Sequence, residues 1–318
     1  MDLDNFCAPH RVDMMRSTGT CLTHADLTVV ANAWNNSNPG SVIPRAVFTK
    51  KSLLWKAIND RFANSCGSLG EHCWVQKVQQ TPNVKAVSIE SFKPLKPSSW
   101  YKNKNEWLNT YDILLVMKQY EKLHKDFKFV GVFPRDFAFR YDGVHCVSRE
   151  MCDPSVFDRK KNVKKYGFIF NHDTHDQPGS HWVALFLCFD QSSKLFGSHY
   201  FDSTGKEPKP EIMDFMNKMS REHDLPIASI KSPIRKQFKN TECGMFSLNF
   251  LIQCIDSEKH ISYHDIVRHM GTDDQIARLR EIFYTPNYLA NNTSGGSSRK
   301  NNAPKTPKMN TKKTKAAM

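Results

Sequence analysis

The pattern of apolar and polar positions changes character near residue 125. Before that point, apolar residues recur at helical spacing, as Leu54, Ile58 and Phe62 do at i, i+4 and i+8 within residues 52–63. The same spacing predicts a helix over residues 24–34, capped by Thr23, and another within residues 105–124, capped by Thr110. The first third of the chain is therefore predicted to be mainly helical.

After residue 125 the pattern favours short strands between polar and glycine-containing loops. Residues 244–255 are apolar almost throughout, which predicts a helix buried on most sides. Amphipathic helices are predicted over residues 209–223 and, after a capping Thr272, over residues 272–284. Strands are predicted at residues 127–137, 166–170, 181–189, 195–202 and 226–230. The fold class is therefore α+β, with a strand cluster around a buried helix.

Length and composition set the domain organisation. With 318 residues, 39% of them hydrophobic, the chain can bury a sizeable core. We predict a mainly helical accessory region at residues 1–124, a second domain at 125–288 and a disordered basic tail at 289–318. No segment approaches the roughly 18 apolar residues of a membrane span, and the N-terminus lacks a secretory signal, so we expect no membrane insertion.

The charge is concentrated in the tail. The net charge is +13, and residues 291–318 carry seven Lys or Arg and no acid. This composition cannot bury enough surface to fold. Two interpretations stay open: residues 299–315 contact nucleic acid by neutralising phosphates, or the tail is simply solvated. The pair Gly295-Gly296 in the tail is either a self-cleavage site or part of a linker.

The cysteines and histidines give little sign of a metal site or a disulfide framework. Nine cysteines, an odd count without a CxxC pair, fit free thiols in a reducing compartment. The segment NHDTHDQPGSH, with His172, His175 and His181, could be drawn as a zinc site, but a polar loop before a strand is the preferred interpretation. We predict no metal and no cofactor.

Cys243 stands at the start of the apolar helix, where unpaired backbone N–H groups and the helix dipole favour a thiolate, the nucleophilic form. Cys188 and Cys254 lie inside apolar segments, where a thiolate is disfavoured. Gly244, next to the cysteine, would let a substrate backbone come close. Burial without a function is the alternative for Cys243.

Three further residues could complete a catalytic site. If the strands at 181–189 and 195–202 form an antiparallel hairpin, His181 and Asp202 lie side by side, and the carboxylate orients the imidazole. Gln237 and the backbone N–H of Cys243 could form an oxyanion hole. Trp182 could wall a cleft beside His181. Each residue also has an ordinary structural explanation, so only the combination indicates acyl transfer.

The segments GSHWVALFL, YFDSTG and QFKNTECGMFSLNF together resemble the adenain/SUMO-protease clan of cysteine proteases. The order His181, Asp202, Gln237, Cys243 is the order of that clan, and the closest likeness is to the polyprotein-processing branch found in African swine fever virus and giant DNA viruses. One departure is Asp202, where the swine fever enzyme has Asn. The resemblance covers residues 165–256 well.

The resemblance implies a central mixed sheet with a buried helix that carries the nucleophile. It further implies cleavage of viral core polyproteins, often after Gly-Gly in a channel roofed by Trp182, in the virion core and at assembly sites in the host cytoplasm. Three alternatives stay open: a deubiquitinase or SUMO-like isopeptidase acting on host conjugates, an acyltransferase, and a non-enzymatic basic virion core protein.

Overall fold

The computed structural model describes residues 6–152, 162–232, 234–257 and 260–290 of the chain. Within these ranges the strands are β1 (Phe127–Pro134), β2 (Lys165–Asn171), β3 (Trp182–Cys188), β4 (Gly197–Phe201) and β5 (Ile227–Ser229). The α-helices are α1 (Val12–Thr18), α2 (His24–Ser37), α3 (Lys51–Cys66), α4 (Glu71–Lys77), α5 (Pro82–Ser91), α6 (Thr110–Leu123), α7 (Arg149–Cys152), α8 (Pro210–His223), α9 (Cys243–Asp256), α10 (Tyr263–His269), α11 (Asp273–Arg278) and α12 (Arg280–Phe283). The short 3-10 helices are η2 (Pro9–Arg11), η3 (Pro39–Ser41), η4 (Arg45–Thr49), η5 (Gly67–Leu69) and η6 (Ser98–Tyr101).

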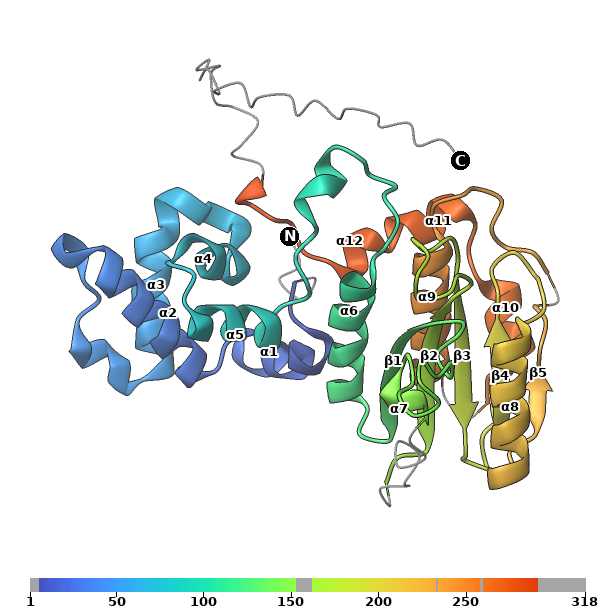
Figure 1. Ribbon diagram of the computed structural model, residues 1–318. Helices are drawn as coiled ribbons and strands as arrows, with labels where there is room; N and C mark the ends of the chain where they lie inside the picture. Colours follow the sequence, from blue (N-terminus) through green and yellow to red (C-terminus); the bar gives the residue numbers. More distant parts are fainter. Residues whose placement is uncertain (1–5, 153–161, 233, 258–259, 291–318) are drawn as a thin grey trace, which may run out of the picture.

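The five strands form one mixed sheet in the order β1-β2-β3-β4-β5 (Figure 1). β1 runs parallel to β2, β3 runs antiparallel to both β2 and β4, and β5 runs parallel to β4. The predicted hairpin is present, because Ala184 on β3 pairs with Phe201 on β4. The predicted α+β class is confirmed.

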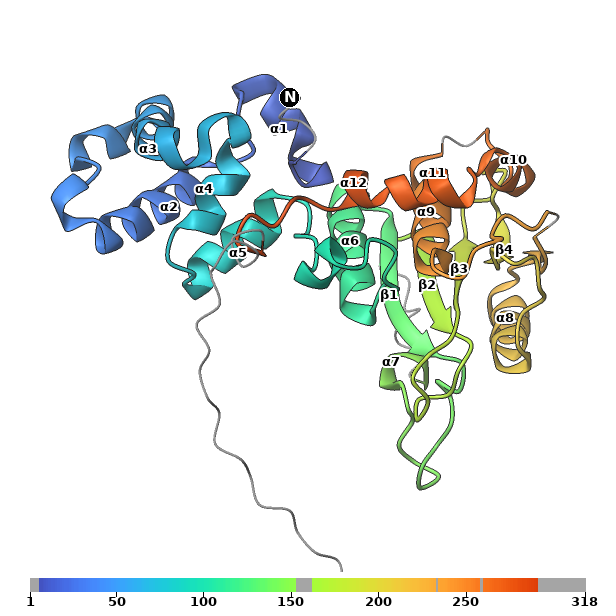
Figure 2. The same cartoon turned by 90° about the horizontal axis from the view of Figure 1, so that it is seen from above.

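Helices cover both faces of the sheet. Alternate side chains of β3 enter two different clusters: Ala184 and Phe186 pack with α9, whereas Val183 and Leu185 pack with α8. Figure 2 shows α8 and α9 on opposite sides of the sheet. Because neither face meets solvent, β3 is apolar along almost its whole length.

The N-terminal helices α1 to α5 have a hydrophobic cluster of their own, built around side chains such as Leu27, Ile58 and Trp74. Helix α6 lies between this cluster and the sheet (Figure 1). Leu108 and Ile113 already belong to the cluster of the sheet, although they precede residue 124. The domain boundary at residue 124 stays a prediction.

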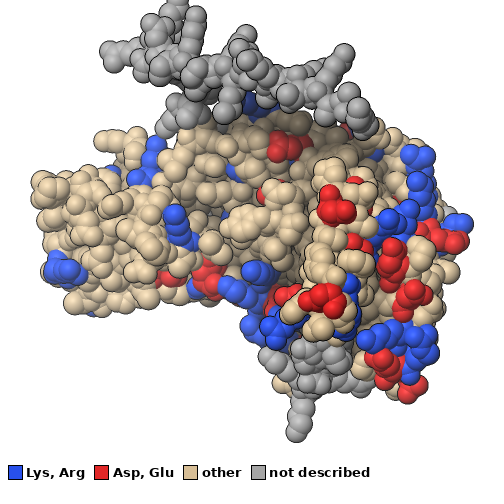
Figure 3. All heavy atoms as spheres, in the orientation of Figure 1, with Lys and Arg blue, Asp and Glu red and all other residues tan. Residues whose placement is uncertain are grey.

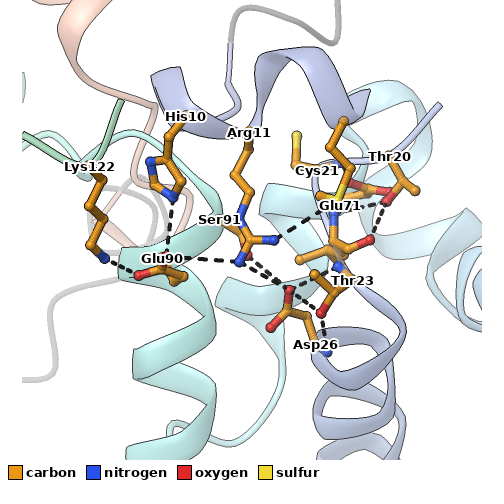
Figure 4. A network of polar contacts seen from close by, with 12 residues as sticks. His10, Arg11, Thr20, Cys21, Thr23, Asp26, Glu71, Glu90, Ser91 and Lys122 are labelled. Carbon is orange, nitrogen blue, oxygen red and sulfur yellow. Dashed lines mark hydrogen bonds and ion pairs between the residues drawn. The ribbon is translucent and has the colours of Figure 1, made fainter. Parts of the chain in front are cut away.

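A polar network joins the N-terminal region to α6 (Figure 4). Glu90 on α5 accepts a hydrogen bond from His10 Nε2 at 3.2 Å and pairs with Lys122 in the last turn of α6. Arg11 lies 3.7 Å from Asp26 and 4.0 Å from Glu90. The C-terminal end of α6 is thereby tied to η2 and α5.

The expectation that the cysteines are free thiols is wrong for six of the nine. The structure pairs them in three disulfides, Cys7–Cys21, Cys66–Cys73 and Cys146–Cys152, and leaves Cys188, Cys243 and Cys254 as thiols. The three pairs are local, with sequence separations of 14, 7 and 6 residues. An odd count requires only one unpaired cysteine, so it did not exclude them. The argument for a reducing compartment loses its basis accordingly.

Two helix ends differ from the prediction. The N-cap of α6 is Asn109, not Thr110, because Asn109 and Asp112 form a reciprocal capping box. Thr272 caps a helix as predicted, but that helix divides at Leu279 into α11 and α12.

Acidic and basic side chains are interspersed on the α8 side of the molecule (Figure 3). Residues 291–318, with the basic segment 299–315 and Gly295-Gly296, lie outside the described residues. In the ranges that the structure describes, no helix combines the length and apolar character needed to cross a membrane.

Candidate active site

Cys243 is the first residue of α9 and is only 2% exposed. It follows Glu242, whose carboxylate forms a buried ion pair with Arg280 at 3.0 Å. The rest of α9 is held in the core through residues such as Met245, Phe246 and Leu248. The position of the sulfur is therefore fixed by a helix that cannot move without disrupting the core, and the first-turn N–H groups of that helix lie beside it.

His181 and Asp202 meet at one end of the sheet. His181 directly precedes β3 and Asp202 directly follows β4, and the two strands are antiparallel neighbours. His181 Nε2 donates a hydrogen bond to Asp202 Oδ1 at 2.8 Å. The Cys243 side chain is a second hydrogen-bonding partner of His181. The structure thus brings together the three residues that the sequence singled out as base, orienting acid and nucleophile.

His181 and Asp202 stabilise each other's charged form. Burial alone would lower the pKa of His181, but hydrogen bonds and charge interactions with Asp202 and Cys243 outweigh it and raise the pKa to about 9. Burial would raise the pKa of Asp202, but the hydrogen bond and charge of His181, with the bonds from Thr204, lower it. At neutral pH, His181 is therefore an imidazolium between a carboxylate and a sulfur nucleophile.

Asp202 is fully buried, and among the residues that the structure describes, Oδ1 receives all the hydrogen bonds of its carboxylate. Oδ1 accepts from His181, from the Thr204 backbone N–H at 2.7 Å and from Thr204 Oγ1 at 2.8 Å. The DSTG sequence of residues 202–205 is typical of a turn, and the hydrogen bonds of this turn also fix the orientation of the Asp202 carboxylate.

Gln237 is buried and held by the residue after Asp202. Ser203 accepts a bond from the Gln237 backbone N–H at 2.9 Å and donates its hydroxyl to Gln237 Oε1 at 2.5 Å. Gln237 Nε2 donates to the Lys239 carbonyl at 2.7 Å, which leaves its second N–H available for another acceptor. Ser203 is a functional residue that the sequence reasoning missed, since it read as part of an ordinary turn.

Trp182 is fixed beside the nucleophile. Its indole Nε1 donates to the Leu108 carbonyl at 2.8 Å. A Cβ added at Gly244 would lie 3.0 Å from Leu108 Cβ and 3.1 Å from Trp182 Cδ1. The expected substrate contact on that side of Gly244 is therefore not supported, because the protein's own side chains fill the space.

A groove of about 640 Å³ begins at Trp182. Its walls are the start of α6, the end of β1 and the loop before His181, and they include Trp107, Tyr141, Val147, Ser148 and Asn171. The pattern of residues 105–124 predicts a helix and no part of a site. Trp107, Leu108 and Asn109 nevertheless line the groove, and a tryptophan shortly before a helix cap is the signal that could have indicated it.

The three histidines of the possible zinc segment do not come together. His172 stacks edge-on against His181, with ring centroids 4.9 Å apart. Burial and the charge of His181 lower the pKa of His172 to about 4. His175 instead pairs with Asp136 at 2.6 Å. His172 is thus a close neighbour of His181, a position that the sequence reasoning did not assign to it.

Comparison with known proteins finds similarity to viral thiol proteases. It is 28% identical over 302 residues to a protein of Acanthamoeba polyphaga mimivirus named putative thiol protease R355, covering 88% of this chain and 93% of the relative. It is 27% identical over 126 residues to a protein of African swine fever virus, isolate Tick/Malawi, that is named a cysteine protease, covering 38% of this chain and 44% of that protein. The corresponding protein of isolate Pig/Kenya, 26% identical over 126 residues, is named a SUMO-1 cysteine protease. The matched segment spans less than half the length of the swine fever enzymes. No protein-family model matches the chain.

The fold comparison extends further than the sequence match to the swine fever enzymes. The crystal structure of the African swine fever virus protease superposes with a TM-score of 0.59 at 18% identity, covering 90% of this chain and 98% of that one. That likeness includes the N-terminal helices as well as the sheet, because it spans nearly the whole of both chains. By sequence and by fold, this chain is a homologue of these viral thiol proteases.

Proposed function

We propose that this protein is a cysteine endopeptidase that cleaves viral core polyproteins after Gly-Gly during virion maturation, in the virion core and at cytoplasmic assembly sites. Homology to viral cysteine proteases supports the protease activity. The observation that carries the proposal is the position of His181, which bonds Asp202 at 2.8 Å and has Cys243 as its other partner.

The mechanism follows from this arrangement. The Cys243 sulfur attacks the peptide carbonyl carbon, and the oxyanion accepts hydrogen bonds from the Cys243 backbone N–H and the remaining Gln237 N–H. His181 gives its proton to the leaving amine, whose departure completes the thioester. The now neutral His181 then takes a proton from the water that hydrolyses the thioester. Asp202 keeps the imidazole oriented throughout.

Specificity for glycine is proposed from the packing around Trp182. Its indole is bonded to Leu108 and packed against Gly244, so it cannot swing away without losing both contacts. A channel with such a fixed wall beside the sulfur favours substrate residues without side chains.

The test is cleavage of Gly-Gly-X peptides by the full chain and two variants. Cys243→Ala is expected to lower the rate by more than about a thousandfold, because no other group supplies the nucleophile. Cys188→Ala is the matched control, since Cys188 is also a buried thiol. Wild-type rates in Cys243→Ala would overturn the proposal, and equal cleavage of Ala-Ala-X peptides would overturn the glycine specificity.

The second candidate is an isopeptidase acting on ubiquitin or SUMO conjugates. The name of the Pig/Kenya relative, a SUMO-1 cysteine protease, favours SUMO. Side-by-side rates on SUMO conjugates, ubiquitin conjugates and viral core precursors distinguish the two. Faster turnover of the precursors supports the maturation role, and faster turnover of a conjugate replaces it.

A further inference from the structure

Three potential metal ligands converge beside the nucleophile. His172, His181 and Asp202 each offer one nitrogen or oxygen atom, and these atoms all lie within 4.8 Å of one another. They come from three neighbouring strands: His172 follows β2, His181 precedes β3 and Asp202 follows β4. The backbone N–H of His172 donates to the His181 carbonyl at 2.9 Å, which fixes the two histidines side by side.

The second carboxylate oxygen of Asp202 differs from the first in its hydrogen bonding. Oδ2 is buried and has no hydrogen-bond partner among the residues that the structure describes, whereas Oδ1 accepts three bonds. A buried carboxylate oxygen without a donor is costly, and in native proteins it calls for an explanation such as an ion, a water or a catalytic role.

We propose that His172, His181 and Asp202 form a binding site for Zn²⁺ whose occupation switches the protease off. Two imidazoles and one carboxylate are a ligand set that zinc takes in proteins, with a fourth position left open. Tetrahedral ligands about 2 Å from zinc are roughly 3.3 Å apart, so the three atoms need to close by at most about 1.5 Å. Side-chain rotation at the partly exposed His172 and His181 can supply such a movement.

Inhibition follows from what the metal displaces. When His181 gives its Asp202-facing nitrogen to zinc, the proton that it shares with Asp202 leaves to solvent. The carboxylate then binds the metal instead of orienting a protonated imidazole. The metal-bound imidazole carries a single proton, on the nitrogen that faces Cys243, so it cannot take up the proton of the Cys243 thiol. Giving that proton to the leaving amine would leave an imidazolate, so the thioester does not form productively. This inhibitory consequence rests on the proposed function, whereas the metal site itself does not.

The site is tested first by binding, without reference to activity. Zn²⁺ is titrated into the full chain carrying Cys243→Ala, in competition with a chromophoric chelator, so that the catalytic thiol does not contribute. One equivalent is expected to bind. Adding His172→Asn is expected to weaken zinc affinity at least about tenfold. Even the loss of an outer-shell partner of a metal lowers metal affinity about 10–100-fold.

His175→Asn in the same background is the matched control, because His175 lies in the same loop but bonds Asp136. It is expected to leave zinc affinity unchanged. Asp202→Asn is a second ligand variant, should His172→Asn fail to fold, and circular dichroism reports on folding in each case. No zinc binding by the Cys243→Ala parent, or ligand variants that bind zinc as tightly as this parent, overturns the site.

Activity supplies the second readout. Zn²⁺ is expected to inhibit cleavage of a Gly-Gly-X peptide by wild type, a chelator to restore it, and His172→Asn to raise the inhibitory concentration at least about tenfold relative to His175→Asn. Inhibition that His172→Asn leaves unchanged would assign the effect to Cys243 alone and overturn the proposal. Zinc binding through His172 in a chain that cleaves no peptide would uphold the site and reject the proposed function.

Discussion

At the scale of single residues, the chemistry depends on what each side of the His181 ring faces. Nε2 faces the Asp202 carboxylate at 2.8 Å, and Cys243 is the other hydrogen-bonding partner. Asp202 is deprotonated and fully buried, so it can only accept. The imidazole is therefore held in the form that carries a proton on Nε2, and its protonated state has favourable partners on both sides.

The pH dependence of cleavage tests this arrangement. The partners of His181 raise its pKa to about 9, so the imidazolium is present at neutral pH and is lost above about pH 9. We expect kcat/KM to fall on the alkaline side with an apparent pKa near 9. The free energy of unfolding depends on pH in the same direction. The stabilising contribution of His181 is complete below its unfolded pKa of about 6.5 and is lost as pH rises through about 9.

Asp202→Asn provides the comparison for this profile. Removing the negative charge takes away an interaction that raises the pKa of His181, so the alkaline limb is expected to move to lower pH. A limb that stays in place in the variant would show that Asp202 does not set the protonation of His181.

At the scale of elements, hairpin order was enough to predict where His181 and Asp202 meet. The start of one antiparallel strand lies beside the end of the next, and this relation needs no distant contact. The same rule, applied to the strands predicted at 166–170 and 181–189, would also have placed His172 beside His181. Leu108 and Ser203 could not be found in this way. Leu108 meets Trp182 across 74 residues of sequence, and no spacing rule connects a helix start to a strand start that far away.

The start of α9 depends on a buried ion pair, which gives a prediction for that element. Glu242 and Arg280 are 2% and 4% exposed, and Arg280 also stacks on Trp100 at 4.5 Å. Glu242→Gln leaves the guanidinium without its anion, so we expect a loss of about 3–5 kcal/mol in the free energy of unfolding. Denaturant melts of the purified variant measure it.

The control for this variant is Asp60→Asn, which breaks the exposed pair with Lys56 on α3. It is expected to cost less than about 1 kcal/mol. Equal losses in the two variants would mean that the Glu242–Arg280 pair does not anchor α9.

At the scale of the whole molecule, α6 connects the N-terminal helices to the active site. Its last turn pairs with Glu90 through Lys122, and Leu108, just before its first turn, holds Trp182. The N-terminal region thus supports one wall of the groove through α6. The likeness to the swine fever protease over 90% of the chain includes this region, so the helices and the sheet form a shared architecture.

The cysteine pairing gives a prediction for the molecule as a whole. With three disulfides and three thiols, alkylation of the denatured, non-reduced protein is expected to modify Cys188, Cys243 and Cys254 alone. Intact-mass measurement counts the added groups, and alkylation after reduction gives the full nine as reference. Nine groups without reduction would contradict the pairing.

The central claim is that Cys243 is a nucleophile activated by His181. The most direct measurement is labelling of the native chain with a peptide ending in Gly-Gly and an electrophilic group, followed by mass mapping of the adduct. We expect one adduct, on Cys243. This adduct forms far more slowly in His181→Ala, and the buried thiols Cys188 and Cys254 form none. An unlabelled Cys243, or labelling at the same rate in His181→Ala, would contradict it.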